Sequence, residues 1–77
     1  MGVRIVYGLV QATETALTYR WGHKDTELNW TATIDPRDLD APVTGDGDPQ
    51  NRDKMAGKVM SRRLREGEWP KGGAIQS

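Results

Sequence analysis

The chain has 77 residues, no cysteine and a formal net charge of zero at pH 7. A chain this short corresponds to one small domain that buries only about 60% of its unfolded surface, and it forms neither disulfides nor cysteine-based metal sites. No apolar run approaches the roughly 20 residues of a membrane span, and residues 1–10 lack the pattern of a signal peptide, so we expect a cytoplasmic protein without membrane contact.

The charges are distributed unevenly along the chain. Residues 1–49 contain four basic and eight acidic side chains, whereas residues 50–77 contain seven basic and three acidic ones. The first part therefore carries a net charge of −4 and the second part a net charge of +4. Two interpretations fit this pattern: the two parts attract each other within the fold, or the basic part binds an anionic partner.

Three segments in the first half of the sequence have the pattern of β-strands. Residues 3–10 are rich in β-branched and aromatic side chains. In residues 15–21 and 26–34, apolar and polar side chains alternate, which is typical of strands with one buried face. Short polar segments separate the three, so they predict an antiparallel meander with one apolar face and one polar face.

A helix is predicted over residues 49–66. Asp48 is suited to cap its first N–H groups, Pro49 fits the first helical position, and Gly67 is a typical terminator. The apolar side chains of this segment gather on one half of the helix, with a narrow basic stripe beside them. Between the strands and this helix, the proline- and aspartate-rich residues 35–48 predict a flexible acidic loop.

These elements predict an α+β fold of β-β-β-α order, in which a three-stranded antiparallel meander packs on one C-terminal helix. Residues 1–67 form the single domain, and residues 68–77 are predicted to be an irregular tail. The expected core consists of Ile5, Tyr7, Leu9, Leu17, Tyr19, Trp21, Leu28, Trp30, Ile34, Val59, Met60 and Leu64. Val6 and Val10 lie on the opposite face of the first strand, where a second copy of the chain in a homodimer would cover them.

Catalytic and metal-binding patterns are weak. His23, the one histidine, lies in a turn, and Ser61 lies inside the helix, so they do not form a recognisable nucleophile–base pair. The aspartates of residues 35–48 alternate as in a calcium loop, but Asn51 and Gly57 stand where that loop requires glycine and glutamate. We therefore expect a protein that is not an enzyme and that holds no metal and no cofactor.

Two surfaces are candidates for binding, and the first is the polar face of the sheet. Arg4 and Arg20 stand there among threonines and Asn29, and such side chains are suited to contact phosphates and base edges. The layout of three antiparallel strands followed by a helix resembles the DNA-binding domains of plant ethylene-response factors and the amino-terminal domains of some phage-type integrases. Those domains lay a sheet face into the major groove. The alternative is that threonine and asparagine simply face solvent.

The second surface is the basic stripe of the helix, formed by Lys54, Lys58, Arg62 and Arg65. From the helix onward, LREGEWPKGGAIQS at 64–77 resembles the opening of the GntR family of winged-helix repressors. In that family an amphipathic helix ends at a glycine, which an aromatic-Pro-x-Gly turn follows. The resemblance carries over no base-reading residue, because the family's DNA-reading helix would come after residue 77.

The leading hypothesis is a small, non-enzymatic regulatory binding module with nucleic acid as the favoured partner. Its expected phosphate contacts are Arg4, Arg20, Lys54, Lys58, Arg62 and Arg65. The alternative is a protein-binding adaptor or inhibitor, monomeric or dimeric, anchored by Trp69 and Arg63, since tryptophan and arginine are common interface anchors.

Overall fold

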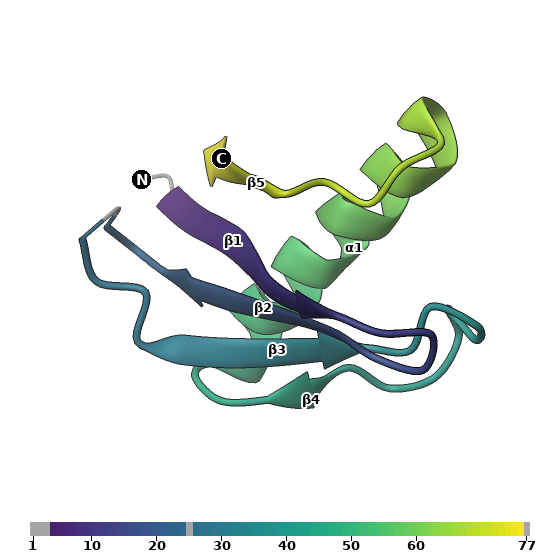
Figure 1. The fold of residues 1–77 in the computed structure, drawn as a ribbon. Coiled ribbons are helices and arrows are strands. Elements are labelled where there is room, and N and C mark those ends of the chain that lie inside the picture. The colour runs from purple at the N-terminus through teal and green to yellow at the C-terminus, as the bar shows by residue number, and fades with distance from the viewer. Residues whose placement is uncertain (1–3, 25, 77) are drawn as a thin grey trace.

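The structure is a computed structural model that describes residues 4–24 and 26–76. Its elements in chain order are β1 (Arg4–Ala12), β2 (Leu17–Gly22), β3 (Trp30–Ile34), β4 (Thr44–Gly45), α1 (Pro49–Glu66) and β5 (Gly72–Gln76) (Figure 1). Residues 3 and 77, which belong to the predicted first strand and tail, lie outside the described residues. Within the described ranges, no helix is long and apolar enough to span a membrane.

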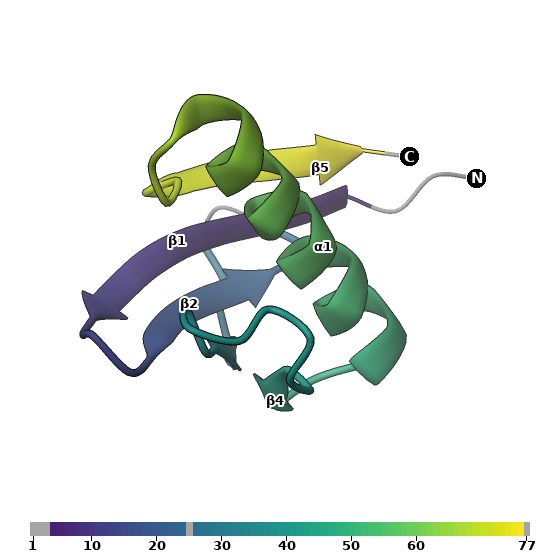
Figure 2. The same ribbon diagram turned by 90° about the vertical axis from the view of Figure 1, so that its right-hand side faces the viewer.

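The strands form one five-stranded antiparallel sheet in the order β4-β3-β2-β1-β5, with α1 on one face (Figures 1 and 2). The predicted α+β class is confirmed, but the three-stranded meander is wrong in detail. β4 lies inside the predicted loop, and β5 replaces half of the tail that was expected to be irregular. Neither has a strand pattern in the sequence, because β4 has two residues and β5 begins with two glycines. β4 and β5 are strands because each pairs with an edge strand of the meander, β4 with β3 and β5 with β1.

The register of the strands gathers the large apolar side chains on one face of the sheet. Tyr7 of β1 lies opposite Trp21 of β2, and Tyr19 of β2 lies opposite Ala32 of β3. All four are buried, whereas the alternate residues of the same strands point to the other face. The strand predicted over 26–34 begins only at Trp30, because Glu27 pairs back with Lys24, and Leu28 and Asn29 have no regular structure.

The helix has the predicted bounds and the predicted caps. The Asp48 carboxylate accepts a hydrogen bond from the Asn51 N–H at 3.4 Å, and Pro49 occupies the first turn. At the other end, Gly67 adopts a left-handed conformation with φ of 82° and its N–H donates to the Arg63 carbonyl at 2.9 Å. Local sequence is therefore sufficient to define where α1 begins and ends.

The buried face of the helix is closer to its N-terminus than predicted. Met55, Ala56 and Val59 are buried against the sheet, Met60 is partly buried, and Leu64 is 76% exposed. Leu64 is thus not a core residue, which corrects the prediction. Leu64 comes nine residues after the buried Met55, which places it about 180° away around the helix, so its side chain points away from the sheet. The buried core comprises Ile5, Tyr7, Leu17, Tyr19, Trp21, Ala32, Ile34, Met55, Ala56 and Val59.

The segment after α1 returns across the core before it joins the sheet. Pro70 is buried, and its carbonyl accepts a hydrogen bond from the Tyr19 hydroxyl at 2.7 Å. One residue later, the Lys71 carbonyl accepts a hydrogen bond from the Leu9 N–H at 2.7 Å. These two contacts hold residues 70 and 71 beside the sheet, so that β5, which begins at the next residue, pairs with β1.

Tyr19 makes the stability of this arrangement sensitive to alkaline pH. Burial, with a smaller contribution from Tyr7, raises the pKa of Tyr19 to about 12 from an ordinary value of 10.0. Because the folded pKa is the higher one, the stabilisation is complete below pH 10 and is lost as the pH rises from about 10 to 12. We expect a loss on the order of 2 kcal/mol over that interval, measurable by urea unfolding at several pH values.

The Tyr19→Phe variant is the control for this expectation. It lacks the titrating hydroxyl, so its stability falls less over the same alkaline interval than that of the unaltered protein. Phenolate absorbance of the folded, unaltered protein reports the ionisation directly. If Tyr19 ionises near pH 10 while the protein is still folded, burial does not control its pKa.

Candidate functional site

One face of the sheet carries no helix. In Figure 1, β1, β2 and β3 lie in front of α1, so the viewer looks onto this uncovered side. We call it the open face. By strand alternation it carries the side chains that point away from the core. It consists of Arg4, Val6, Gly8, Thr18, Arg20, Thr31, Thr33, Thr44, Gly72 and Ala74.

Arg20 is the exposed cation in the middle of the open face. It lies opposite Thr31 of β3 on one side and Gly8 of β1 on the other, and Gly8 in turn lies opposite Gly72 of β5. A β-carbon added at Gly8 would meet only the Lys71 carbonyl oxygen, at 4.0 Å, so nothing stands over this position. The surface beside Arg20 is therefore flat, and it allows close approach of a ligand's backbone.

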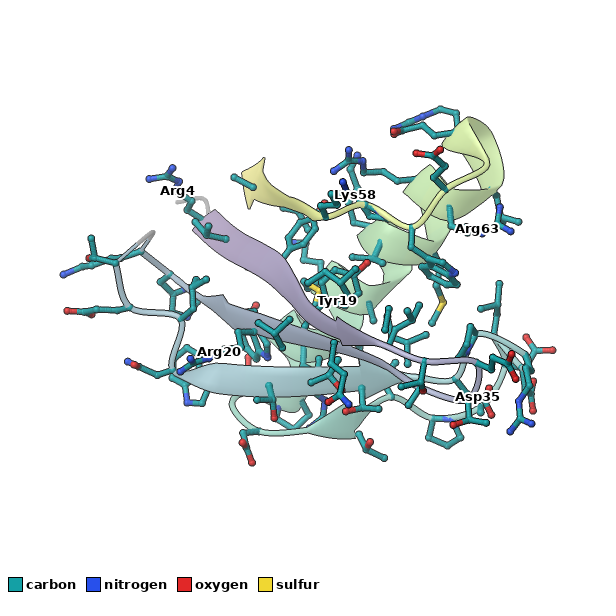
Figure 3. All side chains as sticks on the ribbon, viewed as in Figure 1. Arg4, Tyr19, Arg20, Asp35, Lys58 and Arg63 are labelled. Carbon is teal, nitrogen blue, oxygen red and sulfur yellow. The ribbon has the colours of Figure 1, made fainter. Side chains whose placement is uncertain are left out.

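The two arginines predicted to act on this face are well separated. Arg4 begins β1 opposite Gln76 of β5, and its carbonyl oxygen lies 2.9 Å from His23 Nδ1. Figure 3 shows Arg4 and Arg20 at different places on the sheet, which matches a separation of four residues along the strand direction, or roughly 14 Å. Arg4 and Arg20 can therefore contact different phosphates, but they cannot both bind the same phosphate. Directly after the neighbouring strand β4, the Asp46 carboxylate accepts a hydrogen bond from the Thr31 hydroxyl at 3.2 Å.

The basic stripe of the helix is not a uniform surface, because Arg62 turns inward. Its Nη1 donates to the Tyr7 hydroxyl at 3.0 Å and to the Gly72 carbonyl at 3.1 Å, while its Nε donates to Glu66 at 3.0 Å. The bond to Glu66 raises the pKa of Arg62 and lowers the pKa of Glu66. Arg62 therefore joins α1 to β1 and β5, which is a structural task that the sequence prediction did not assign to it.

The remaining members of the stripe differ in their surroundings. Arg65 lies 3.6 Å from Glu66, which offsets part of its charge. Lys58 is exposed on the side of α1 toward β5 (Figure 3), one helical turn before Arg62. Lys54, two turns before Arg62, continues the same line at the exposed surface of α1. The helix and the open face lie on opposite sides of the sheet, so one ligand cannot contact both basic surfaces at the same time.

The predicted protein-interface anchors also take part in packing. Trp69 is half-buried and lies against the core, and the guanidinium carbon of Arg63 is 5.9 Å from the centre of its ring. Little of Trp69 remains to insert into a partner.

The acidic residues of the predicted flexible loop organise turns. The Asp35 carboxylate accepts the Arg37 N–H at 2.9 Å, and the Asp38 carboxylate accepts the Asp40 N–H at 3.1 Å. Among the residues that the structure describes, no group of three or more histidine, cysteine or acidic side chains is arranged to hold a metal ion. The flexibility of the loop stays a prediction.

Sequence reasoning missed an aromatic cluster and a half-buried arginine near the start of α1. The Trp21 and Trp30 rings lie 5.0 Å apart between centroids, with the His23 ring 5.5 Å from Trp30. Arg52 donates to the Gly45 carbonyl at 2.9 Å, and only 16% of its side chain is exposed. The rings pack directly against one another, so the cluster holds no ligand between them. In the sequence, the only signal for the tryptophan pair was the alternation of apolar and polar side chains in β2 and β3.

Comparisons of this chain with protein-family models, with curated proteins and with solved structures find no match. The resemblance of residues 64–77 to the GntR family therefore gains no support. In the structure, the part of that segment after the Trp69–Pro70 turn is a strand of the sheet.

Proposed function

We propose that this protein is a small regulatory binding module that contacts nucleic acid through the open face of its sheet. The main support is that α1 covers one side only, which leaves Arg20 exposed at the centre of the other. Arg4, at the start of β1, is the second basic residue of this face. Of the two basic surfaces, the open face is favoured because Arg62 on the helix is committed to bonds within the protein.

The chemistry of the open face suits a phosphate backbone. The guanidinium of Arg20 donates hydrogen bonds to phosphate oxygens, and the hydroxyls of Thr18 and Thr33 lie on the same face as further donors. Gly8 and Gly72 have no side chains that project from the open face, so a phosphate backbone can lie close to the sheet at these positions. With few phosphate contacts and no net charge, binding should be weak, and its salt slope should be small because the slope scales with the number of phosphate contacts.

The test compares two charge reversals of equal size on opposite sides of the sheet. Anisotropy of a labelled, random-sequence DNA duplex is measured with Arg20→Glu and with Arg65→Glu at about 50 mM and about 200 mM salt. Arg20→Glu should weaken binding of the duplex about tenfold at low salt and reduce the salt slope by about one. Arg65→Glu should change both the affinity and the salt slope little.

Two results would contradict the proposal. If Arg65→Glu weakens binding and Arg20→Glu does not, the helix is the contact surface. If the unaltered protein does not bind the duplex even at low salt, where phosphate contacts are strongest, nucleic acid is excluded as the partner of the open face.

A further inference from the structure

The two edges of the sheet differ in how well they are protected. At one edge, β4 has only two residues, and Gly45 takes a φ of 141° that interrupts a regular strand. At the other edge, β5 extends over five residues, GGAIQ, without proline or charge. Natural sheets usually protect an edge with short strands, charges, proline or bulges. β5 has none of these within its own sequence.

The hydrogen-bond pattern identifies the backbone groups on the outer side of β5. The Leu9 N–H bonds the Lys71 carbonyl, so residue 71 directs its backbone polar groups toward β1. In an antiparallel pair these directions alternate, which places the polar groups of Gly72 and Ala74 on the outer side. The Arg62 guanidinium reaches the Gly72 carbonyl from that side, in agreement with this assignment. Ala74 is exposed and presents both its N–H and its C=O outward.

Basic side chains surround this outer edge. Arg62 lies over its beginning, Lys58 lies one helical turn along the same side of α1, and Lys71 immediately precedes the strand (Figure 3). Glu66 is hydrogen-bonded to Arg62 and offsets part of its charge, whereas no such acid bond is seen for Lys58 or Lys71 among the described residues. A second copy paired through β5 would bring these cations against their own counterparts, so charge disfavours it.

We propose that the outer edge of β5 binds an extended, acidic segment of a partner protein, which adds a strand to the sheet. The backbone of Ala74 provides the central pair of hydrogen bonds, and alternate acidic side chains of the segment face Lys58. This edge is separated from Arg20, the central cation of the open face, because β1 lies between β2 and β5. The protein can therefore hold an acidic protein segment and a nucleic acid together, as an adaptor between them.

The probe for this site is a labelled ten-residue peptide of alternating glutamate and threonine, with the alternating lysine and threonine peptide as its counterpart. Fluorescence anisotropy measures binding to the unaltered protein and to two variants. Ala74→Pro removes the outward N–H without breaking a bond to β1, and edge strands tolerate proline in that orientation. Lys58→Glu reverses an exposed charge, so it also tests the site should Ala74→Pro fail to fold.

Matched controls accompany both variants. Ala74→Val keeps the N–H and should bind the acidic peptide as well as the unaltered protein does. Arg37→Glu makes the same charge change in the loop after β3, far from β5 (Figure 1), and should alter binding less than twofold. Arg20→Glu should also leave peptide binding intact, which separates this site from the open face.

The expected result is saturable binding of the glutamate peptide that Ala74→Pro abolishes and that Lys58→Glu weakens about tenfold. Hydrogen exchange at the Ala74 N–H should slow when the glutamate peptide is bound. Equal binding of the lysine peptide, or unchanged binding by Ala74→Pro, would overturn the proposal. So would a peptide-free dimer that Ala74→Pro converts to monomer, because the occupant of the edge would then be a second copy.

Discussion

Replacing Trp21 with alanine should leave much of the protein unfolded at room temperature. Its side chain is fully buried in the middle of the core, against Trp30 and beneath Gly47. Truncating a buried tryptophan costs about 3–5 kcal/mol, and a chain of this length has a total stability of roughly 4–12 kcal/mol. Far-UV circular dichroism during urea unfolding measures the loss.

Two further variants make this result interpretable. Trp21→Phe should cost less than its loss of volume implies, because the Trp21 Nε1 is buried without a protein partner and phenylalanine removes that unpaired donor. Trp69→Ala should cost only about 1–2 kcal/mol, since Trp69 is half-buried at the rim of the core. If Trp69→Ala is as damaging as Trp21→Ala, the core is centred closer to the end of α1 than the structure places it.

Gly22→Ala is expected to be clearly destabilising, although it adds only one methyl group. An added β-carbon would lie 2.1 Å from the Glu27 carbonyl oxygen and 3.2 Å from the Leu28 Cα. Both are backbone atoms, so the turn between β2 and β3 would have to move, and with it Trp30 in the core. We expect a loss of about 1–3 kcal/mol, seen as a lower urea midpoint.

The same substitution at Gly8 is the matched control. Gly8 also lies within the sheet and has no positive φ, but an added β-carbon there has space around it. Gly8→Ala should leave stability unchanged or raise it by up to about 1 kcal/mol, because alanine lowers the entropy of the unfolded chain. Equal losses at Gly22 and Gly8 would show that strand glycines matter here for their flexibility and not for the close approach at Gly22.

The candidate site could be predicted only in part. Strand alternation was enough to place Arg20 opposite the buried face. The roles within the basic stripe of α1 could not be predicted, because Lys58 and Arg62 have the same spacing and a similar chemistry in the sequence. They differ only because β5 brings Gly72 beneath one of them, and Tyr7 lies beside it. The unprotected edge of β5 was equally invisible while residues 68–77 were expected to be irregular.

Features that depend on near neighbours could be inferred from the amino-acid sequence. Asp48 and Gly67 define the ends of α1, and the alternation around Tyr19 defines the buried face of the strands. The contacts between distant segments, namely β5 with β1 and Arg62 with Tyr7, became known only from the three-dimensional fold. The physical reason is the range of the interactions: capping and alternation act within a few residues, whereas edge pairing and the position of a helix over a sheet depend on contacts between parts of the chain far apart in sequence.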